Sequence, residues 1–190
     1  MIVVSLALFL CSFGYDKITS FVALYAERSG IAPKKIYFTT FAAVVLATRP
    51  FTGRLADRIG HRRFFMPCLA VAVLGFALLA LPQSRALMVA SAVVFGLGFG
   101  NMYPAYVAYV VKHVDAGRRG AAFGGILAAF DTGIGTGSIC LGAVIHQFGF
   151  SAAFGAAAAL SALSIPYFLF AEKRFLLRRP VVVEPPAAVA

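Results

Sequence analysis

The chain has 190 residues, of which 61% are hydrophobic and 13% charged, and its formal net charge is +10. An ordinary soluble domain is roughly 45–50% apolar and about 25% charged, so this composition argues against a soluble protein. The basic residues recur at the ends of long apolar blocks and form no single stripe, which excludes a nucleic-acid-binding surface and is typical of a membrane protein.

Six apolar blocks approach the length of a membrane span, which takes ~20 residues. In chain order they cover about residues 2–26, 36–51, 64–81, 86–111, 121–145 and 150–171. Lipid offers no partners to backbone N–H and C=O groups, so each block is predicted to be a helix. Short connections predict antiparallel neighbours. We therefore expect an all-α, polytopic membrane domain over residues 1–175.

The two ends of the chain are interpreted from their composition. The first block lacks a basic leader and exceeds the usual length of a signal peptide, so it is predicted to be the first span. The last residues, 176–190, hold Pro180, Pro185 and Pro186. They are predicted to form a disordered cytoplasmic tail.

The distribution of Lys and Arg predicts the orientation in the lipid bilayer. With the N-terminus inside, the inner segments hold Arg54, Arg58, Arg62, Arg63, Lys112, Arg118, Arg119, Lys173, Arg174, Arg178 and Arg179. The outer segments then hold Arg28, Lys34, Lys35 and Arg85. Because basic residues are retained on the cytoplasmic side, both termini are predicted to be cytoplasmic.

An internal repeat links the two halves of the chain. The spacing Gly-x-Leu-x-Asp-x-x-Gly at residues 53–60 returns as Gly-x-Val-x-His-x-x-Gly at residues 142–149. Phe65 and Phe154 follow at the same offset. Three helices followed by three more, starting on opposite sides of the membrane, is the inverted-repeat pattern of secondary transporters.

A short basic stretch, residues 53–63, lies between the second and third spans and is predicted to be a tight cytoplasmic loop with turns at Gly53 and Gly60. Its residue order resembles the signature loop of the major facilitator superfamily, found after the second span of each six-helix half. The matching residues are Gly53, Leu55, Asp57, Arg58, Gly60, Arg62 and Arg63. His61 stands where the family usually has Arg or Lys. The resemblance covers about residues 8–171.

That family normally has twelve spans in two halves, and this chain resembles one of them. The fourth span lacks the Arg that usually precedes the glycines in N-terminal halves. The run from Gly100 through Asn101 and Tyr103 to Pro104 is similar to the fourth span of a C-terminal half. The resemblance therefore implies a complementary half or a second copy as partner. In the family, the loop Asp contacts a helix of the opposite half.

Pairs of glycines four residues apart are typical of close helix packing in lipid. The pairs are Gly96 and Gly100, Gly120 and Gly124, and Gly133 and Gly137. We expect Gly96, Gly100, Gly133 and Gly137 to pack helices. A dinucleotide-binding site is not expected, because the glycine runs lie inside spans and do not complete the required spacing.

Ionisable residues inside the spans are the candidates for a substrate or proton path. Asp131 lies ~16 Å into the fifth span, near midplane, and Asp16 and Lys17 interrupt the first span. Arg49 lies near the cytoplasmic end of the second span. A structural ion pair, such as Arg49 with Asp131, and snorkelling to the interface are the alternatives.

Two polar residues of the fourth span, Asn101 and Tyr103, are further candidates for lining a solute path, and packing is the equal alternative. The cysteines Cys11, Cys68 and Cys140 lie in apolar blocks and are expected to pack as small apolar residues. No metal site and no cofactor are expected, since His113 and His146 have no second ligand at metal-binding spacing.

The predicted function is secondary active transport of a small solute, in symport or antiport with protons, by alternating access in the bacterial cytoplasmic (inner) membrane. The alternative is a truncated or non-transporting membrane protein that acts as an assembly partner. An enzyme is not expected, because the sequence has no metal-ligand pair and no setting for an activated Ser or Cys. The substrate cannot be read from one half of a cavity.

Overall fold

The computed structural model describes residues 2–33 and 35–171, and every regular element among them is a helix. The predicted all-α class is thus confirmed. The helices are α1 (Ile2–Ser12), α2 (Tyr15–Arg28), α3 (Ile36–Ile59), α4 (His61–Ala80), α5 (Arg85–Lys112), the short 3₁₀ helix η1 (Ala116–Arg118) and α6 (Arg119–Ala171). The tail predicted to be disordered, 176–190, lies outside the described residues.

Three helices of the described part are long and apolar enough to cross a membrane, namely α4, α5 and α6. The predicted count of six spans is not confirmed by this criterion and stays a prediction. Helices α1, α2 and α3 do not meet this criterion, for two reasons. The last turns of α3 carry Arg54, Asp57 and Arg58, while α1 and α2 are short because the first predicted span is divided.

The break in the first predicted span lies at Phe13 and Gly14, ahead of the Asp16-Lys17 pair that the sequence analysis took as the interruption. Gly14 is buried where the chain meets two other helices. A Cβ atom there would lie 2.8 Å from Ala157 Cβ and 2.8 Å from the Phe76 ring. The charged pair lies in the first turn of α2 instead.

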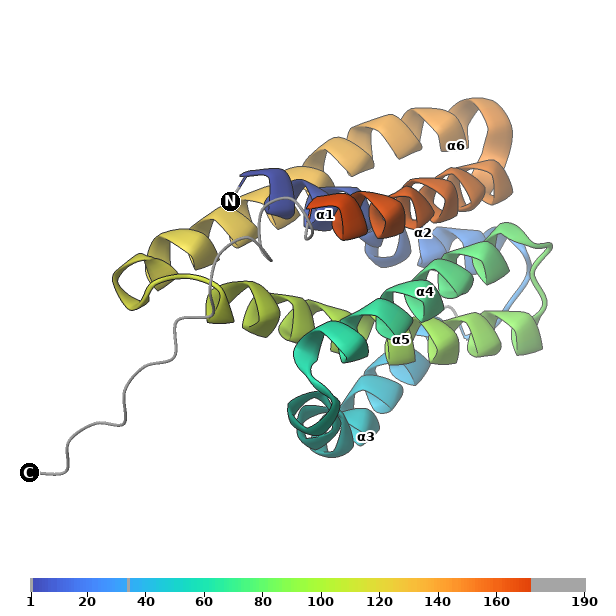
Figure 1. Cartoon of the computed structure of the whole chain (residues 1–190). Coiled ribbons are helices and arrows are strands. Elements are labelled where there is room, and N and C mark those ends of the chain that lie inside the picture. Colours follow the sequence, from blue (N-terminus) through green and yellow to red (C-terminus); the bar gives the residue numbers. More distant parts are fainter. Residues whose placement is uncertain (1, 34, 172–190) are drawn as a thin grey trace, which may run out of the picture.

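The long helix α6 contains the fifth and sixth predicted spans. Its backbone kinks at Gly149, where φ is 84°, and Figure 1 shows the chain doubling back there, from a yellow first limb to an orange-red second limb. We call residues 119–148 the first limb and residues 150–171 the second limb of α6. The kink falls between the apolar blocks at 121–145 and 150–171, whose assignment as two separate spans stays a prediction.

The backbone supports the internal repeat. Gly60, between α3 and α4, has φ 89°, and Gly149, between the two limbs of α6, has φ 84°. Both glycines end one helix and start the next, in a left-handed region that other residues rarely adopt. Phe65 and Phe154, which follow at the same offset, are both buried. In each half of the repeat, a glycine with positive φ thus separates one helix from the next.

The signature stretch is mostly helical, which corrects the prediction of a tight loop over residues 53–63. Its first part, from Gly53 to Ile59, forms the last turns of α3, and α4 begins at His61. The predicted turn at Gly53 is wrong, because that residue lies inside the helix. Leu, Ala and Arg are good helix formers, so the helix continues until Gly60 ends it. The whole connection is this one glycine.

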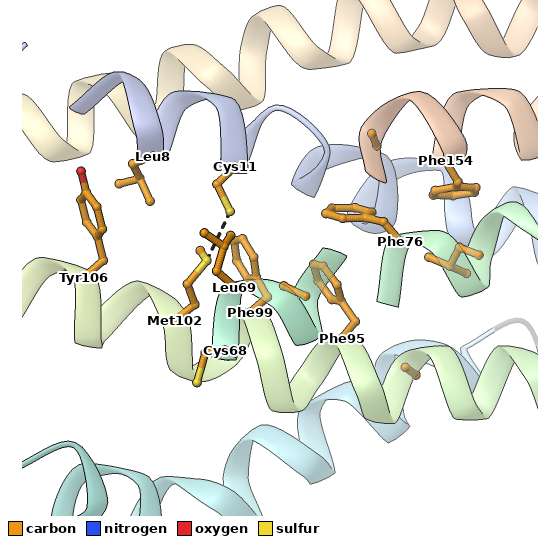
Figure 2. Close-up of a cluster of buried hydrophobic side chains, with 14 of the residues drawn as sticks. Leu8, Cys11, Cys68, Leu69, Phe76, Phe95, Phe99, Met102, Tyr106 and Phe154 are labelled. Carbon is orange, nitrogen blue, oxygen red and sulfur yellow. Dashed lines mark hydrogen bonds between the residues drawn. The ribbon is translucent and has the colours of Figure 1, made fainter. Parts of the chain in front are cut away.

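The core is apolar and rich in aromatic side chains and draws on all six α-helices; Figure 2 shows the part formed by α1, α4, α5 and α6. The rings of Phe95 and Phe99 stack at 5.1 Å, and Tyr15 stacks on Phe99 at 4.3 Å. Such offset ring pairs add stability beyond the area they bury. Cys11 lies 3.2 Å from the sulfur of Met102 in the same cluster.

Glycines allow the helices of this bundle to approach closely. A Cβ atom on Gly96 would lie 3.1 Å from Val44 of α3, and one on Gly100 would lie 2.5 Å from Val45. On the first limb of α6, Gly133 lies against Ser12 and the Phe9 carbonyl, and Gly137 against the Phe13 carbonyl. These four positions hold α5 against α3 and α6 against α1.

Helix α5 packs on α4 and lies between α3 and α6. Both α3 and α6 pack on α5, and Figure 1 shows α3 on the side of α4 and α5 that faces away from α6. The space between α3 and the first limb of α6 is the setting of the candidate site.

Candidate functional site

An open cavity of about 950 Å³ lies over α5, between α3 and the start of α6. Its size is within the range of small-molecule sites, roughly 300–1,000 Å³. The lining residues are Arg49, Thr52, Gly53, Gly100, Asn101, Tyr103, Pro104, Val107, Ala108, Val111, Arg119, Gly120 and Phe123. The cavity thus draws on the second, fourth and fifth predicted spans.

Asn101 is fixed at the seam between α5 and α3. Its amide nitrogen donates to the Leu97 carbonyl at 2.9 Å and to the Thr48 hydroxyl at 3.4 Å. Thr48 in turn donates to the Val44 carbonyl at 2.9 Å. The close approach at Gly100 makes this contact across the helices possible. The polar side chain is therefore held at the cavity wall, and its amide hydrogens are used.

Tyr103 connects the cavity wall to the first limb of α6. Its ring lies 4.9 Å from that of Phe130, and Asp131 is close enough to interact electrostatically with Tyr103. Asp131 itself is exposed on the surface of α6 and does not line the cavity. The cavity thus brings together three of the predicted path residues: Arg49, Asn101 and Tyr103. Asp131 lies outside the cavity, within electrostatic range of Tyr103.

Two further candidates, Asp16 and Lys17, lie in the first turn of α2, and their side chains lie outside the described part of the structure. The ion pair between Arg49 and Asp131 that the sequence analysis considered is not formed among the described residues. Both side chains are exposed.

The residues of the signature stretch border the cavity. A smaller cavity of about 230 Å³ adjoins it and shares Thr52, Gly53 and Asn101 with it. Asp57 and His61 line this smaller cavity and approach each other to 3.7 Å, with side-chain exposures of 75% for Asp57 and 17% for His61. The other matching residues, Leu55, Arg58, Gly60, Arg62 and Arg63, are exposed at the junction of α3 and α4.

Arg119 is the charged lining residue that the sequence analysis did not select as a candidate for the solute path. It was assigned only to the basic residues that set topology. The available signal was its place as the last basic residue before the fifth apolar block, directly ahead of Gly120. Only the packing of the helices brings it to the same cavity as Arg49.

Within residues 2–33 and 35–171, no group of three or more His, Cys, Asp or Glu residues is arranged to hold a metal ion. His113 contacts the carbonyl of its own helix at Tyr109 through Nδ1, at 2.8 Å. The polar side chains that line the cavity carry arginine, amide and hydroxyl groups.

Comparison with known proteins gives one consistent family. The sequence profile described as Major Facilitator Superfamily matches residues 4–189. An uncharacterized MFS-type transporter of Pseudomonas aeruginosa, strain UCBPP-PA14, is 29% identical over 171 residues, which are 89% of this chain and 42% of that protein. The uncharacterized MFS-type transporter YhhS of Escherichia coli, strain K12, is 26% identical over 160 residues, or 84% of this chain and 40% of YhhS.

Solved structures show the same fold. A crystal structure of the peptide transporter POT in complex with sulfate superposes with a TM-score of 0.81 at 22% identity, covering 95% of this chain and 39% of that one. The POT family transporter PepTSo gives a TM-score of 0.75 at 22% identity, covering 97% of this chain and 39% of PepTSo. The chain spans about two-fifths of the length of the curated relatives it matches.

Proposed function

The chain belongs to the Major Facilitator Superfamily, and from this premise we propose that it supplies one six-helix half of a secondary active transporter for a small solute. The half would be of the C-terminal type. It would lie in a bacterial inner membrane with both termini cytoplasmic, in accord with its basic residues.

The observation that carries this proposal is the open cavity between α3, α5 and α6. Transporters of this architecture bind their solute at the interface of two helix bundles, which then rock around it. Here the cavity faces outward from the bundle and collects arginine, amide and hydroxyl groups from three helices. Such a surface suits a solute that is enclosed only when a second bundle covers it.

A second bundle is also suggested by length, because the chain spans 42% of its Pseudomonas relative and 40% of YhhS. Either a complementary half or a second copy of this chain would complete the path. Asp57, at the edge of the smaller cavity and 75% exposed, is then available to a helix of the second bundle. In this proposal it acts as a cytoplasmic latch.

The proposal also includes proton coupling, with Asp131 as the group that binds the proton. Asp131 is an exposed carboxylate beside Tyr103, on the same limb of α6 that begins at the cavity. An intramembrane carboxylate that takes and releases a proton can couple solute movement to a proton gradient.

Reconstitution tests the proposal. The chain is purified alone and together with a candidate second half, and its assembly is measured by native mass spectrometry in mild detergent. Proteoliposomes loaded with a pH-sensitive dye then report proton movement when anionic, neutral and cationic solutes are added. We expect transport from the assembled form. Asp57→Asn should lower the rate without changing insertion.

Two results would contradict the proposal. A strict monomer that moves none of the solutes, alone or with the second half, would favour the alternative of a non-transporting assembly partner. An unchanged rate in Asp57→Asn, with the parent protein active, would remove the latch role alone. The control Arg85→Gln, at the start of α5 on the opposite side of the membrane in this topology, should match the parent.

A further inference from the structure

Two opposite charges lie at the same level of the bundle, on the two helices that flank α5. Within residues 101–103 of α5, one side chain bonds to the Thr48 hydroxyl of α3 at 3.4 Å, and another has its ring 4.9 Å from that of Phe130 on α6. The next residues along the chain are Arg49 and Asp131, and both are exposed. Ionisable side chains at membrane depth are retained where they are paired or wet. These two charges therefore suit a partner that presents the reverse arrangement.

Each charge belongs to an open stripe of its helix, because residues three or four apart lie on one face. The α3 stripe consists of Leu46, Arg49 and Gly53, and the α6 stripe consists of Leu127, Asp131 and Gly135. All six residues are exposed. The α3 stripe borders the large cavity through Arg49 and Gly53, and the α6 stripe continues at the same spacing from Gly120, which also lines it. Both stripes thus flank one cavity.

The helices that carry the stripes run in opposite directions. Contacts of α5 with α3 advance in the same direction along both helices, from Gly96 beside Val44 to Asn101 bonded to Thr48, so α3 and α5 are parallel. The short connection over residues 113–118 then reverses the chain between α5 and α6. The first limb of α6 is therefore antiparallel to α3.

The two stripes are complementary when they are laid against each other in this antiparallel sense. With the two charged residues at one level, a rise of about 1.5 Å per residue places Leu46 within about 2 Å of the level of Gly135, and Gly53 at about the level of Leu127. Neither glycine has an atom within 4 Å of where a Cβ would be, and Leu46 is 76% exposed. Each leucine would thus face a glycine with open space above it.

We infer that a second copy of this chain covers this face, with α3 of each copy against the first limb of α6 of the other. Two copies with the same predicted orientation in the membrane are related by a two-fold axis along the membrane normal, which keeps every residue at its level. Arg49 of each copy then pairs with Asp131 of the other, twice per dimer, and the second copy closes the cavity. The inference rests on the proposed function, because it names the second bundle that the transport path requires.

Charge reversal tests the pairing between copies. Self-association in mild detergent is measured by native mass spectrometry and by fluorescence energy transfer between differently labelled copies. Arg49→Asp alone and Asp131→Arg alone each create two like-charged contacts per dimer and should weaken association about a hundredfold. An equimolar mixture of the two variants should associate within about tenfold of the parent. In that mixture, each contact between the two different chains again joins an arginine and an aspartate.

The control is Arg85→Asp, which reverses an exposed charge at the start of α5, about 24 Å along the helix from the level of residue 101. It should associate like the parent, and all variants should keep the helical content of the parent. Single variants that associate as well as the parent, or a mixture that associates no better than its components, would overturn the inference.

Crosslinking tests the register without changing a charge. Cys140 is exposed, so it is replaced by serine. A copy with Leu46→Cys and a differently tagged copy with Gly135→Cys should be joined by a short bifunctional thiol reagent. The control pairs Leu46→Cys with Phe148→Cys, which is also exposed and lies about 20 Å further along the same limb. Equal yields from the two mixtures, or no product from the first, would contradict this register.

A complementary half is the other possible occupant of the face. A chain that stays monomeric, and instead binds a candidate second half with a loss in Arg49→Asp, overturns the second-copy assignment and leaves the transport proposal standing. Charge-dependent dimers that move no solute in proteoliposomes leave the interface standing and remove the transport function. Uptake that is lost in each single variant and regained in their mixture supports both.

Discussion

The first limb of α6 carries glycines on two faces, one packed against a neighbouring segment and one open. On one face, Gly133 and Gly137 lie against the backbone of α1, where an added Cβ would collide with carbonyl oxygens. On the other, Gly124 and Gly135 have no atom within 4 Å of where a Cβ would be. The packed face meets α1 and the turn after it, and at these two glycines the open face meets no other part of the described chain.

The difference shows that glycine spacing alone does not identify a packing contact. Gly120 and Gly124 are four residues apart, as are Gly133 and Gly137, yet only the second pair meets a neighbouring helix. Small residues on a lipid-spanning helix favour close approach of another helix. In the proposed assembly, the open face would receive the second bundle, and it continues into the cavity at Gly120.

The largest effect is expected on the packed face. Gly137→Val should destabilise the chain by about 3 kcal/mol, because two methyl groups cannot fit against the Phe13 carbonyl unless α1 moves. Chemical unfolding in detergent micelles measures it. The control Gly135→Val, two residues away on the open face, should change stability by about 0.5 kcal/mol or less. Equal losses in both variants would remove the distinction between the faces.

A bulky residue on the open face should affect assembly instead of folding. Gly124→Leu is expected to reduce association with the second half or second copy about tenfold, since it blocks close helix approach. Native mass spectrometry measures the assembled fraction. Unfolding of the single chain should not change. Ala159→Leu, an exposed position on the second limb, is the control, and an equal loss there would mean that the open face is not the interface.

A smaller effect is expected from the hydrogen bond that ties the packed face together. The Ser12 hydroxyl is buried and lies 3.0 Å from two carbonyl oxygens, that of Phe130 on α6 and that of Phe9 in its own helix. Ser12→Ala should cost about 0.6–1 kcal/mol, measured by thermal unfolding in detergent. Thr132→Ala is matched to it, because among the described residues the Thr132 hydroxyl donates within its own helix, to the Ala128 carbonyl. It should be close to neutral, and the reverse order would contradict the assignment.

The smallest effect is expected when alanine replaces a glycine, and its sign should differ between the two faces. Gly135→Ala should stabilise the chain by about 0.5 kcal/mol, because alanine costs less backbone entropy than glycine in a helix and meets no neighbour here. Gly133→Ala should destabilise it, since the new methyl group meets Ser12 and the Phe9 carbonyl. Paired thermal unfolding curves give both signs. Stabilisation at both positions would show that α1 does not pack as described.

Apolar length and breaker residues were enough to predict several elements. The predicted spans at 64–81 and 86–111 agree with α4 (His61–Ala80) and α5 (Arg85–Lys112) to within a few residues. The break between the last two predicted spans falls at Gly149, where only glycine adopts the backbone conformation at little cost. These features are local, so a single stretch of sequence contains the information.

The signature stretch was predicted less well. Its residue order identified the family, but its charges suggested a loop, whereas helix continues through Asp57 to Ile59. The interruption of the first span was likewise assigned to Asp16 and Lys17 instead of Gly14. A charged side chain indicates contact with water or lipid headgroups. A helix can carry such side chains there without ending.

The sequence by itself determined the membrane class, the all-α fold and the family, because apolar blocks, basic ends and an ordered motif are all properties of short stretches. Tertiary structure alone decided which glycines pack, and it alone brought Arg119 to the same cavity as Arg49. Both depend on how α6 lies on α1 and α5, and that placement results from contacts between residues more than a hundred positions apart, such as Ser12 with Phe130.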